Sequence, residues 1–284
     1  MKTLLTQAMD RLYYLVLPDR MRKALKLLLS RSRRYWPKII TDFSEDTVIV
    51  IAPHMDDEIL GCGGTLRKHV LSGAYVTVVY MTDGRRGGDH EFYRCESSQE
   101  AMKNFQSALV KERKKEARRA AEIIGIQEQI FLDHCDGCLQ VSHRTIDQLR
   151  AVLLEKKPEI IYLPSILDIH PDHRATNKIL YAAIKNSYGA KDIFPICREY
   201  EVWTPLLANR IIDISDVVDT KHKAIEQFSS QMAQANYLRA QLALNAYRSL
   251  YHSQGFGYAE AFFESRAEEY GSLVRRFMAK DLSQ

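Results

Sequence analysis

Two short segments of the sequence concentrate histidine and acidic side chains. The first is PHMDDE at residues 53–58, and the second is DIHPDH at residues 168–173. Acidic side chains this close together raise one another's pKa, and a divalent cation reverses the sign of that interaction. Histidine and aspartate are zinc ligands, and a set of three leaves one coordination position for water, as catalytic zinc sites require. The two segments therefore predict a metal-dependent catalytic site, provided that the fold brings them together.

Each segment comes after a predicted strand. TVIVIA at 47–52 is a β-branched run typical of a strand that is buried on both faces, and EIIYL at 159–163 is a second apolar run. In open α/β sheets, ligands bind beyond the carboxyl ends of the strands. We therefore expect segments 53–58 and 168–173 to meet at that edge of the sheet. The glycine-rich stretch at 61–64 lacks the spacing of a nucleotide-binding loop.

Short apolar runs alternate with helical periods over most of the chain. The patterns predict strands at 47–52, 75–81, 129–132, 159–163, 199–203 and 210–214. They predict helices at 57–72, 95–124, 142–156, after 172 to about 187, 216–234 and 236–250. This alternation indicates a Rossmann-like α/β fold, with a mostly parallel sheet and helices on both faces.

The basic charge of the chain is concentrated at its N-terminus. Residues 1–40 hold ten Lys and Arg against two Asp, a net charge of +8, which leaves 30 basic and 34 acidic groups, a net charge of −4, for the rest. We predict a basic amphipathic helical extension over 1–40 and one α/β domain over 41–284. The acidic balance of that domain argues against nucleic-acid binding, which needs basic groups on the folded face. The extension would either pack on the domain or lie on an anionic membrane surface.

The chain has the features of a cytoplasmic protein, with residues 1–40 as the candidate contact to the inner face of the membrane. No apolar run reaches the roughly 18 residues of a membrane-spanning helix, and the N-terminus does not resemble a secretory signal. Five cysteines, an odd number in a long chain, do not indicate a disulfide scaffold. Cys135 and Cys138 have the spacing of a redox pair or of half a zinc knuckle. A redox pair should open a helix and a knuckle needs a second pair, so we expect two reduced thiols near the rim of the cleft.

Taken together, PHMDDE and the later HPDH resemble the PIG-L/LmbE family of zinc-dependent N-deacetylases, whose substrates are N-acetylglucosaminyl and related amino sugars. The resemblance covers most of residues 45–265. Weaker matches are Thr82-Asp83-Gly84, Arg113-x-x-Glu116, Ile124-Gly125, Asp136-Gly137 and Ser230-Gln231, and residues 258–262 look like the C-terminal segment of some bacterial members. The resemblance implies an LmbE-like fold, one zinc ion per chain, and hydrolysis of the acetamide of a glycolipid, polysaccharide or glycosylated natural product.

The resemblance also implies which residues carry out the reaction. His54, Asp57 and His173 would hold the zinc ion. Asp56 would be the general base that takes a proton from the zinc-bound water. The spacing of His54 and Asp57 matches the family, although Pro53 precedes the histidine where Ala-His-Pro is common.

The remaining roles concern the substrate. By the same resemblance, His170 would stabilise the oxyanion and give a proton to the departing amine, and Asp172 would orient its imidazole. Arg113 and Asp136 would hold sugar hydroxyls or an attached charged group. Asp168 departs from those thiol-pathway members that have tyrosine at this position, which argues against their substrates.

Two other functions stay open at this stage. A metal-dependent phosphoesterase would need ligands for two ions about 4 Å apart, and the sequence offers one three-ligand set. A membrane-surface protein with an inactive cleft would be favoured by the loss of a ligand or of Asp56, and all of these residues are present. The ion itself is also open, because His/Asp sites accept iron or cobalt as well as zinc.

Overall fold

The computed structural model describes residues 36–88, 93–94, 98–187 and 195–278. Contacts divide the chain into Met1–Pro37 and Lys38–Gln284. The predicted basic helix at residues 19–36 lies outside the described residues except for Trp36. No helix in the described part of the chain is long and apolar enough to span a membrane.

An eight-stranded sheet runs through the second unit, counted over the described residues. Its order is β1 (Lys38–Ile40), β7 (Arg210–Asp213), β8 (Ala259–Arg266), β6 (Ile196–Tyr200), β5 (Ile160–Pro164), β2 (Thr47–Ala52), β3 (Tyr75–Thr82) and β4 (Glu128–His134). Neighbouring strands are parallel, except that β8 is antiparallel to both β6 and β7. The predicted α/β fold with a mostly parallel sheet is confirmed. The sheet begins at Lys38, three residues before the predicted start of the α/β domain.

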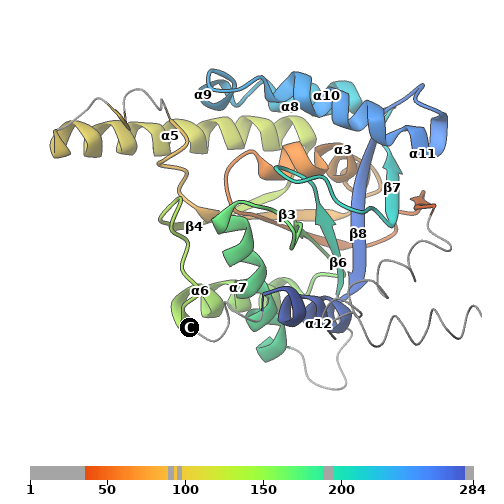
Figure 1. Cartoon of the computed structure of the whole chain (residues 1–284), viewed down its shortest axis with the longest axis horizontal. Coiled ribbons are helices and arrows are strands. Elements are labelled where there is room, and N and C mark those ends of the chain that lie inside the picture. Colours follow the sequence, from red (N-terminus) through yellow and green to blue (C-terminus); the bar gives the residue numbers. More distant parts are fainter. Residues whose placement is uncertain (1–35, 89–92, 95–97, 188–194, 279–284) are drawn as a thin grey trace, which may run out of the picture. The chain divides into compact units, whose positions relative to one another are not determined.

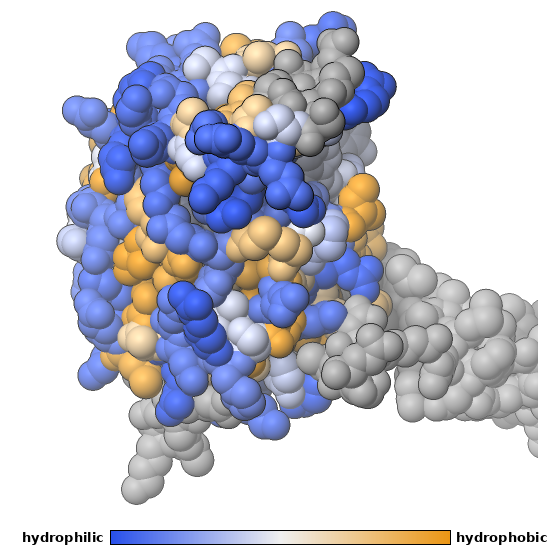
Figure 2. Space-filling view, turned by 90° about the vertical axis from the view of Figure 1, so that its left-hand side faces the viewer, coloured by the Kyte–Doolittle hydropathy of each residue, from blue (hydrophilic) through white to orange (hydrophobic). Residues whose placement is uncertain are grey.

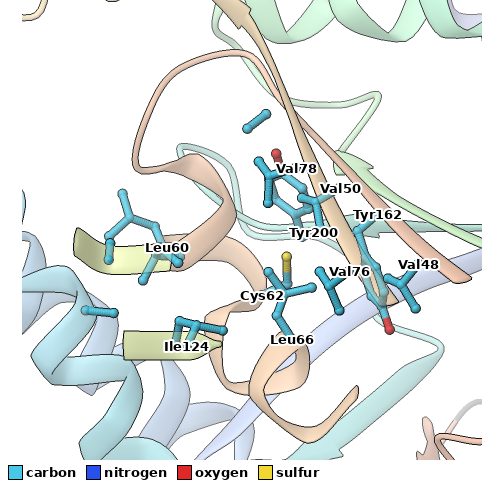
Figure 3. Close-up of a cluster of buried hydrophobic side chains, with 14 of the residues drawn as sticks. Val48, Val50, Leu60, Cys62, Leu66, Val76, Val78, Ile124, Tyr162 and Tyr200 are labelled. Carbon is cyan, nitrogen blue, oxygen red and sulfur yellow. The ribbon is translucent and has the colours of Figure 1, made fainter. Parts of the chain in front are cut away.

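Helices cover both faces of the sheet (Figure 1). One face carries α3 (Asp57–Leu71), α5 (Gln99–Ile124), α8 (Val218–Ile225), α9 (Ser229–Met232) and α10 (Tyr237–Arg248), which α11 (Leu250–Ser253) follows. The other face carries α6 (His143–Lys156), α7 (Pro171–Ser187) and α12 (Ala267–Phe277). Alternate residues of the strands supply two separate hydrophobic cores. Figure 3 shows the first core, where Val48, Val50, Val76 and Val78 of the sheet pack near Leu60, Cys62 and Leu66 of α3.

The predicted elements near the C-terminus need correction. The strand predicted at 199–203 is β6 at Ile196–Tyr200, and the helix predicted at 216–234 is divided into α8 and α9. Strand β8 and helix α12 were not predicted. In β8, the sequence AEAFFESR mixes acidic and apolar residues without a regular alternation. A β-strand in the middle of a sheet can hold such acidic residues when they have buried partners. Glu260 is one of them.

Helix α3 has a kink that brings its first turn to the carboxyl edge of the sheet. Cys62 has non-helical angles (φ −146°, ψ 17°) inside the helix. The carboxylate of Glu260 on β8 accepts the backbone N–H groups of Gly64 and Thr65 at 2.9 and 2.8 Å, so it caps the second half of α3. The ammonium of Lys221 lies 2.7 Å from the same carboxylate, and both side chains are buried. A buried ion pair with these additional hydrogen bonds fixes the kink in place.

The side of the molecule at which α5 begins and β4 ends is mainly hydrophilic. Figure 2 shows this side, with smaller hydrophobic areas between the polar side chains. Along α5, Arg113 and Glu116 are buried charged residues within the strongly charged run 111–119. The helix therefore turns two of its charged side chains towards the protein interior.

Candidate active site

The two segments rich in histidine and acid come together at the carboxyl edge of the sheet. Strands β2 and β5 are direct neighbours, with Val50 opposite Tyr162. Segment 53–58 leaves β2 at this edge, and segment 168–173 follows β5. The ring centroids of His54 and His173 are 5.4 Å apart. The predicted convergence of the two segments is therefore present.

Asp57 lies between two of the predicted metal-binding imidazoles. Its Oδ2 atom is 3.1 Å from His54 Nδ1 and 3.2 Å from His173 Nε2. Bond lengths of about 2.0–2.2 Å place neighbouring ligand atoms of a tetrahedral zinc ion about 3.3 Å apart, which both distances approach. Burial acts to raise the pKa of Asp57, but the charges and hydrogen bonds of His173 and His54 outweigh it and hold the pKa well below its ordinary value. Asp57 is thus an anion in contact with both histidines, as the predicted metal ligand should be.

Buried, unpaired ring nitrogens give a separate indication of a cation. Both nitrogens of His173 are buried without a well-aligned hydrogen bond to the described residues. Such atoms cost free energy unless a ligand satisfies them. Nδ1 of His173 lies 3.4 Å from Asp168 Oδ2, which leaves Nε2 for a metal ion. Metal-binding histidines commonly hold a carboxylate on their other nitrogen, so the donors present fit a divalent cation.

His54 is supported in the same way. Its Nε2 atom lies 3.1 Å from both Asp172 Oδ2 and Asp136 Oδ1. Asp172 also accepts the backbone N–H groups of Gly137 at 2.7 Å and Leu139 at 2.9 Å. The carboxylate of Asp172 thus contacts His54, whereas its backbone N–H approaches His170 Nδ1 at 3.2 Å, so we propose that Asp172 orients His170 through its backbone.

Other combinations of donors also approach one another at this site. His54, His170 and His173 each offer an atom within 4.8 Å of the other two, and so do His54, Asp136 and Asp172. The first combination differs from the predicted one by His170 in place of Asp57. The carboxylates of the second already hold backbone N–H groups. We therefore keep Asp57 with His54 and His173 as the proposed ligand set.

Asp56 has a strained backbone and a perturbed carboxyl group. Its φ angle is +142°, a region that non-glycine residues rarely adopt. Burial raises the pKa of its side chain to about 7, against the lowering effect of Arg113. A general base works best when its pKa lies near the working pH. The guanidinium of Arg113 lies 3.4 Å from the Asp56 carboxylate and donates to the carbonyl oxygens of Met55 at 2.7 Å and Gly84 at 3.2 Å.

Glu58 holds the strained residue from the protein interior. One carboxylate oxygen accepts the Asp56 N–H at 3.1 Å, and the other accepts the hydroxyl of Tyr80 at 2.7 Å. Gln129 donates to that same hydroxyl at 3.0 Å. The side chain of Glu58 is fully buried, and this burial raises its pKa to about 8. Sequence patterns identified Glu58 only as one of three clustered acids, since its contact with Tyr80 depends on the neighbouring strand.

His170 lies beside two of the predicted metal ligands, His54 and His173. Its ring is 4.7 Å from that of His54 and nearly perpendicular to it. The backbone N–H of Asp172 approaches its Nδ1 atom at 3.2 Å, so the proton of the neutral ring belongs on Nε2. Partial burial and then the charges of His54 and His173 lower the pKa of His170. The ring can therefore donate a hydrogen bond from Nε2.

A cleft of about 340 Å³ opens over these residues. Of the predicted site residues, His54, Asp56, Asp57, Arg113, Asp136 and His170 line it. The buried side chain of His173 lies behind Asp57, and Asp172 lies behind His54. Sequence analysis missed Trp203 and Tyr237, whose rings lie 6.3 Å apart at the wall of the cleft. These two aromatic residues come from a loop and from α10, and no local pattern relates them to the metal ligands.

Comparison with known proteins agrees with this geometry. The model of one protein family, PIG-L (GlcNAc-PI de-N-acetylase), matches residues 49–184. Residues 49–184, just under half of the chain, thus match the PIG-L family. The protein is 27% identical over 197 residues to the diacetylchitobiose deacetylase of Thermococcus kodakarensis, covering 65% of this chain and 69% of that protein. It is 29% identical over 202 residues to a probable N-acetyl-alpha-D-glucosaminyl L-malate deacetylase 2 of Bacillus cereus, covering 66% of this chain and 84% of that protein.

A solved structure supports the fold over a larger share of the chain. The N,N'-diacetylchitobiose deacetylase of Pyrococcus horikoshii, in complex with an inhibitor, is similar with a TM-score of 0.65. The similarity covers 95% of this chain and 96% of that one at 23% identity, a level at which it supports the fold alone. Because its relatives are named deacetylases, the protein is an enzyme of the deacetylase type.

Two of the weaker sequence matches form one contact in this structure. Glu116 on α5 accepts hydrogen bonds from the hydroxyl groups of Ser229 and Ser230 at 2.8 and 2.7 Å. Gln231 then donates to the carbonyl oxygen of Gly87 at 2.7 Å and lines the cleft. Glu116 thus fixes the start of α9, which places Gln231 at the wall of the cleft.

Proposed function

We propose that this protein removes the acetyl group from an N-acetylglucosaminyl-type sugar, with His54, Asp57 and His173 holding one zinc ion. The observation that carries the proposal is the position of Asp56 and His170 in one cleft with two of the predicted metal ligands, His54 and Asp57. An amide needs both an activated nucleophile and an acid for its poor leaving group. The names of the relatives support an acetylated amino sugar as the substrate.

Each residue then has a distinct task. When bound, a divalent cation supplies Lewis acidity to water and to the substrate carbonyl. Asp56 accepts the proton of the attacking water, and Arg113 holds its carboxylate in position. His170 donates a hydrogen bond from Nε2 to the developing oxyanion. The departing amine takes its proton from a protonated His170 or from the Asp56 carboxyl group that has accepted one from the water.

The walls of the cleft suit a sugar. Trp203 and Tyr237 offer aromatic faces, and Gln231 and Gln234 offer amides. Asp136 can accept a sugar hydroxyl, since it borders the cleft beside His54. Arg113 makes its hydrogen bonds to the protein backbone, so we propose that it acts on Asp56 more than on the sugar.

Acetate release from N-acetylglucosaminyl conjugates by the zinc-loaded chain tests this proposal. Asp56→Asn should lower kcat by about 10²–10⁴-fold, the usual contribution of a general base, while the bound zinc stays at one ion per chain. The double variant His54→Ala/His173→Ala should lose the ion. Zinc binding that survives the double replacement would disprove the ligand assignment, and full activity of Asp56→Asn would disprove the role of the base.

Metal content separates this proposal from a phosphoesterase. A two-metal phosphoesterase would bind two ions per chain and release phosphate from phosphate esters. The two groups of donors described above, His54 with His170 and His173 and His54 with Asp136 and Asp172, share His54. We therefore expect one ion. Two tightly bound ions together with phosphate release would favour the alternative.

A further inference from the structure

The sequence Cys135-Asp136-Gly137-Cys138 forms a tight turn directly after β4. The backbone N–H of Cys138 approaches the carbonyl oxygen of Cys135 at 3.4 Å. Gly137 has a φ angle of +76°, the value that a type II turn requires at its third residue. In a β-turn the first and fourth Cα atoms are less than about 7 Å apart, which overlaps the range of about 4.4–6.8 Å that a disulfide needs.

The side chains of the two cysteines point to the same side of this turn. Their Sγ atoms are 2.6 Å apart. Cys138 is exposed and Cys135 is partly buried, whereas Cys62 and Cys197 are buried. The spacing alone favoured two independent thiols, because neither flanking helix nor second pair was expected. In this protein a β-turn, and not the first turn of a helix, brings the two Sγ atoms together.

Positive charge lies next to the pair. Arg85 and Arg86 act to lower the pKa of the Cys135 thiol, although the hydrogen bond with Cys138 and then burial raise it to about 11. Cys135 therefore stays protonated at neutral pH while its partner is intact, and the exposed Cys138 is the sulfur that a small reactant meets first. Neighbouring arginines favour thiolate formation during exchange.

The turn is also part of the wall of the candidate active site. Asp136 contacts His54, and the N–H of Gly137 donates to Asp172 at 2.7 Å. Both residues between the sulfurs line the cleft. A side chain at position 137 would be strained and would meet Arg86, since an added Cβ would lie 2.9 Å from Arg86 Cδ. The turn is therefore fixed from both sides, which keeps the sulfurs in contact.

We propose that Cys135 and Cys138 are a redox site that reacts with low-molecular-weight disulfides. The thiolate of Cys138 attacks one sulfur of the small disulfide, which forms a mixed disulfide and releases one small thiol. Cys135 then loses its proton and attacks the Sγ of Cys138, which forms the internal disulfide and releases the second small thiol. Two protein thiols are oxidised and one small disulfide is reduced to two thiols, so protons and electrons balance.

Thiol counting on the folded, full-length chain tests the proposal. A Cys95→Ser background removes the cysteine that lies outside the described residues. The protein is incubated with mixtures of reduced and oxidised glutathione, quenched with acid, alkylated under denaturing conditions and weighed by intact mass spectrometry. Two thiols should be lost without any bound glutathione, and dithiothreitol should restore both.

Matched single variants show which sulfur reacts first. With Cys135→Ser, we expect one stable glutathione adduct on Cys138, because no second thiol can resolve it. With Cys138→Ser, the adduct on Cys135 should form several-fold more slowly. The proposal is overturned if both thiols remain alkylatable in a tenfold excess of oxidised glutathione, or if the parent chain stops at a glutathione adduct. None of these measurements depends on deacetylase activity, so the result stands apart from the proposed function.

Discussion

Asp56 carries an uncommon backbone conformation because its surroundings hold it there. Its N–H is held by Glu58, its carboxylate is approached by Arg113, and its carbonyl oxygen accepts the N–H groups of Ile59 and Leu60 in the first turn of α3. A strained residue persists only where its neighbours fix it. The orientation of the proposed base therefore depends on Glu58, a residue that does not line the cleft.

Replacement of Glu58 should expose this dependence. We expect Glu58→Ala to lower kcat by about 10²-fold, the cost of a misplacement of roughly 1 Å. Glu58→Gln keeps the size and an acceptor for the Asp56 N–H, so it should retain activity within several-fold. Activity assays with zinc content as the control distinguish positioning from loss of the site. Equal activity of the alanine and glutamine variants would show that the hydrogen bond has no positioning role.

Of the individual residues of the candidate site, some could be predicted from the sequence and others could not. His54, Asp57 and His173 stand in two dense motifs at strand ends, so their meeting follows from the topology of parallel strands. The support given by Asp168 to His173 depends on the path of a loop, and Trp203 and Tyr237 reach the cleft from distant elements. Tertiary packing alone positions such residues.

Helix α3 shows how one element places the site. Its first turn carries Asp57 and Glu58, and its kink at Cys62 is capped by Glu260 from β8. Just before the kink, Gly61 packs against the buried ring of Tyr200. A Cβ at Gly61 would lie 2.3 Å from Tyr200 Cδ2, far inside contact distance. The hydroxyl of Tyr200 donates to the carbonyl oxygen of Ile51 at 2.9 Å, so the ring is not free to move away.

Gly61→Ala should therefore destabilise the fold. We expect the free energy of unfolding in urea to fall by about 1–3 kcal/mol, the usual cost of overpacking a core. Gly63→Ala is the matched control, because its Cβ would lie 3.1 Å from the side chain of Ile59 and 3.4 Å from Cγ of Lys221, the second of which is an ordinary van der Waals contact. Its effect should stay below about 1 kcal/mol, helped by the better helix propensity of alanine. A loss for Gly61→Ala no larger than for the control would contradict the packing argument.

Most elements of the first two hundred residues could be predicted because their signals are local. Runs of β-branched residues identify β2 and β3, and Gly125 with φ +89° ends α5 where the pattern predicts it. Strand β8 was missed because its acidic residues are explained only by partners elsewhere: Glu260 by Lys221, and Glu264 by Arg198 at 2.8 Å. A strand pattern disturbed by buried ion pairs cannot be recognised from periodicity.

Stability of the whole molecule should depend on a buried histidine far from the metal ligands. His69 on α3 is buried, and its Nε2 atom lies 2.9 Å from the hydroxyl of Tyr162. Burial and then Arg198 lower the pKa of His69 to about 3. Phe43 packs against its ring, and Glu45 lies 3.7 Å from Nδ1. The folded protein thus holds this histidine neutral, whereas the unfolded chain protonates it near pH 6.5.

The sign of the pH effect follows from these two values. Below pH 6.5 the unfolded state binds one more proton, at His69, than the folded state does. The contribution of neutral His69 to the free energy of unfolding is therefore complete above pH 6.5 and is lost as the pH falls towards 3. His69→Gln should abolish this loss, which amounts to about 1.4 kcal/mol per pH unit. Urea unfolding of both proteins at pH 7.5 and pH 5 measures it. Parallel pH dependences in the two proteins would refute the assignment.

The insertion of β8 between β6 and β7 has a consequence for how the chain is made. The ribosome delivers β1, β6 and β7 well before β8, and β1 joins the sheet only through β7, which itself needs β8 as its neighbour. The cap on α3 also arrives with Glu260 on this late strand. The helix that carries Asp57 can therefore reach its final geometry only after Glu260 has been synthesised. A nascent chain halted before residue 259 would contain both segments rich in histidine and acid, but it would lack the Glu260 cap that holds α3.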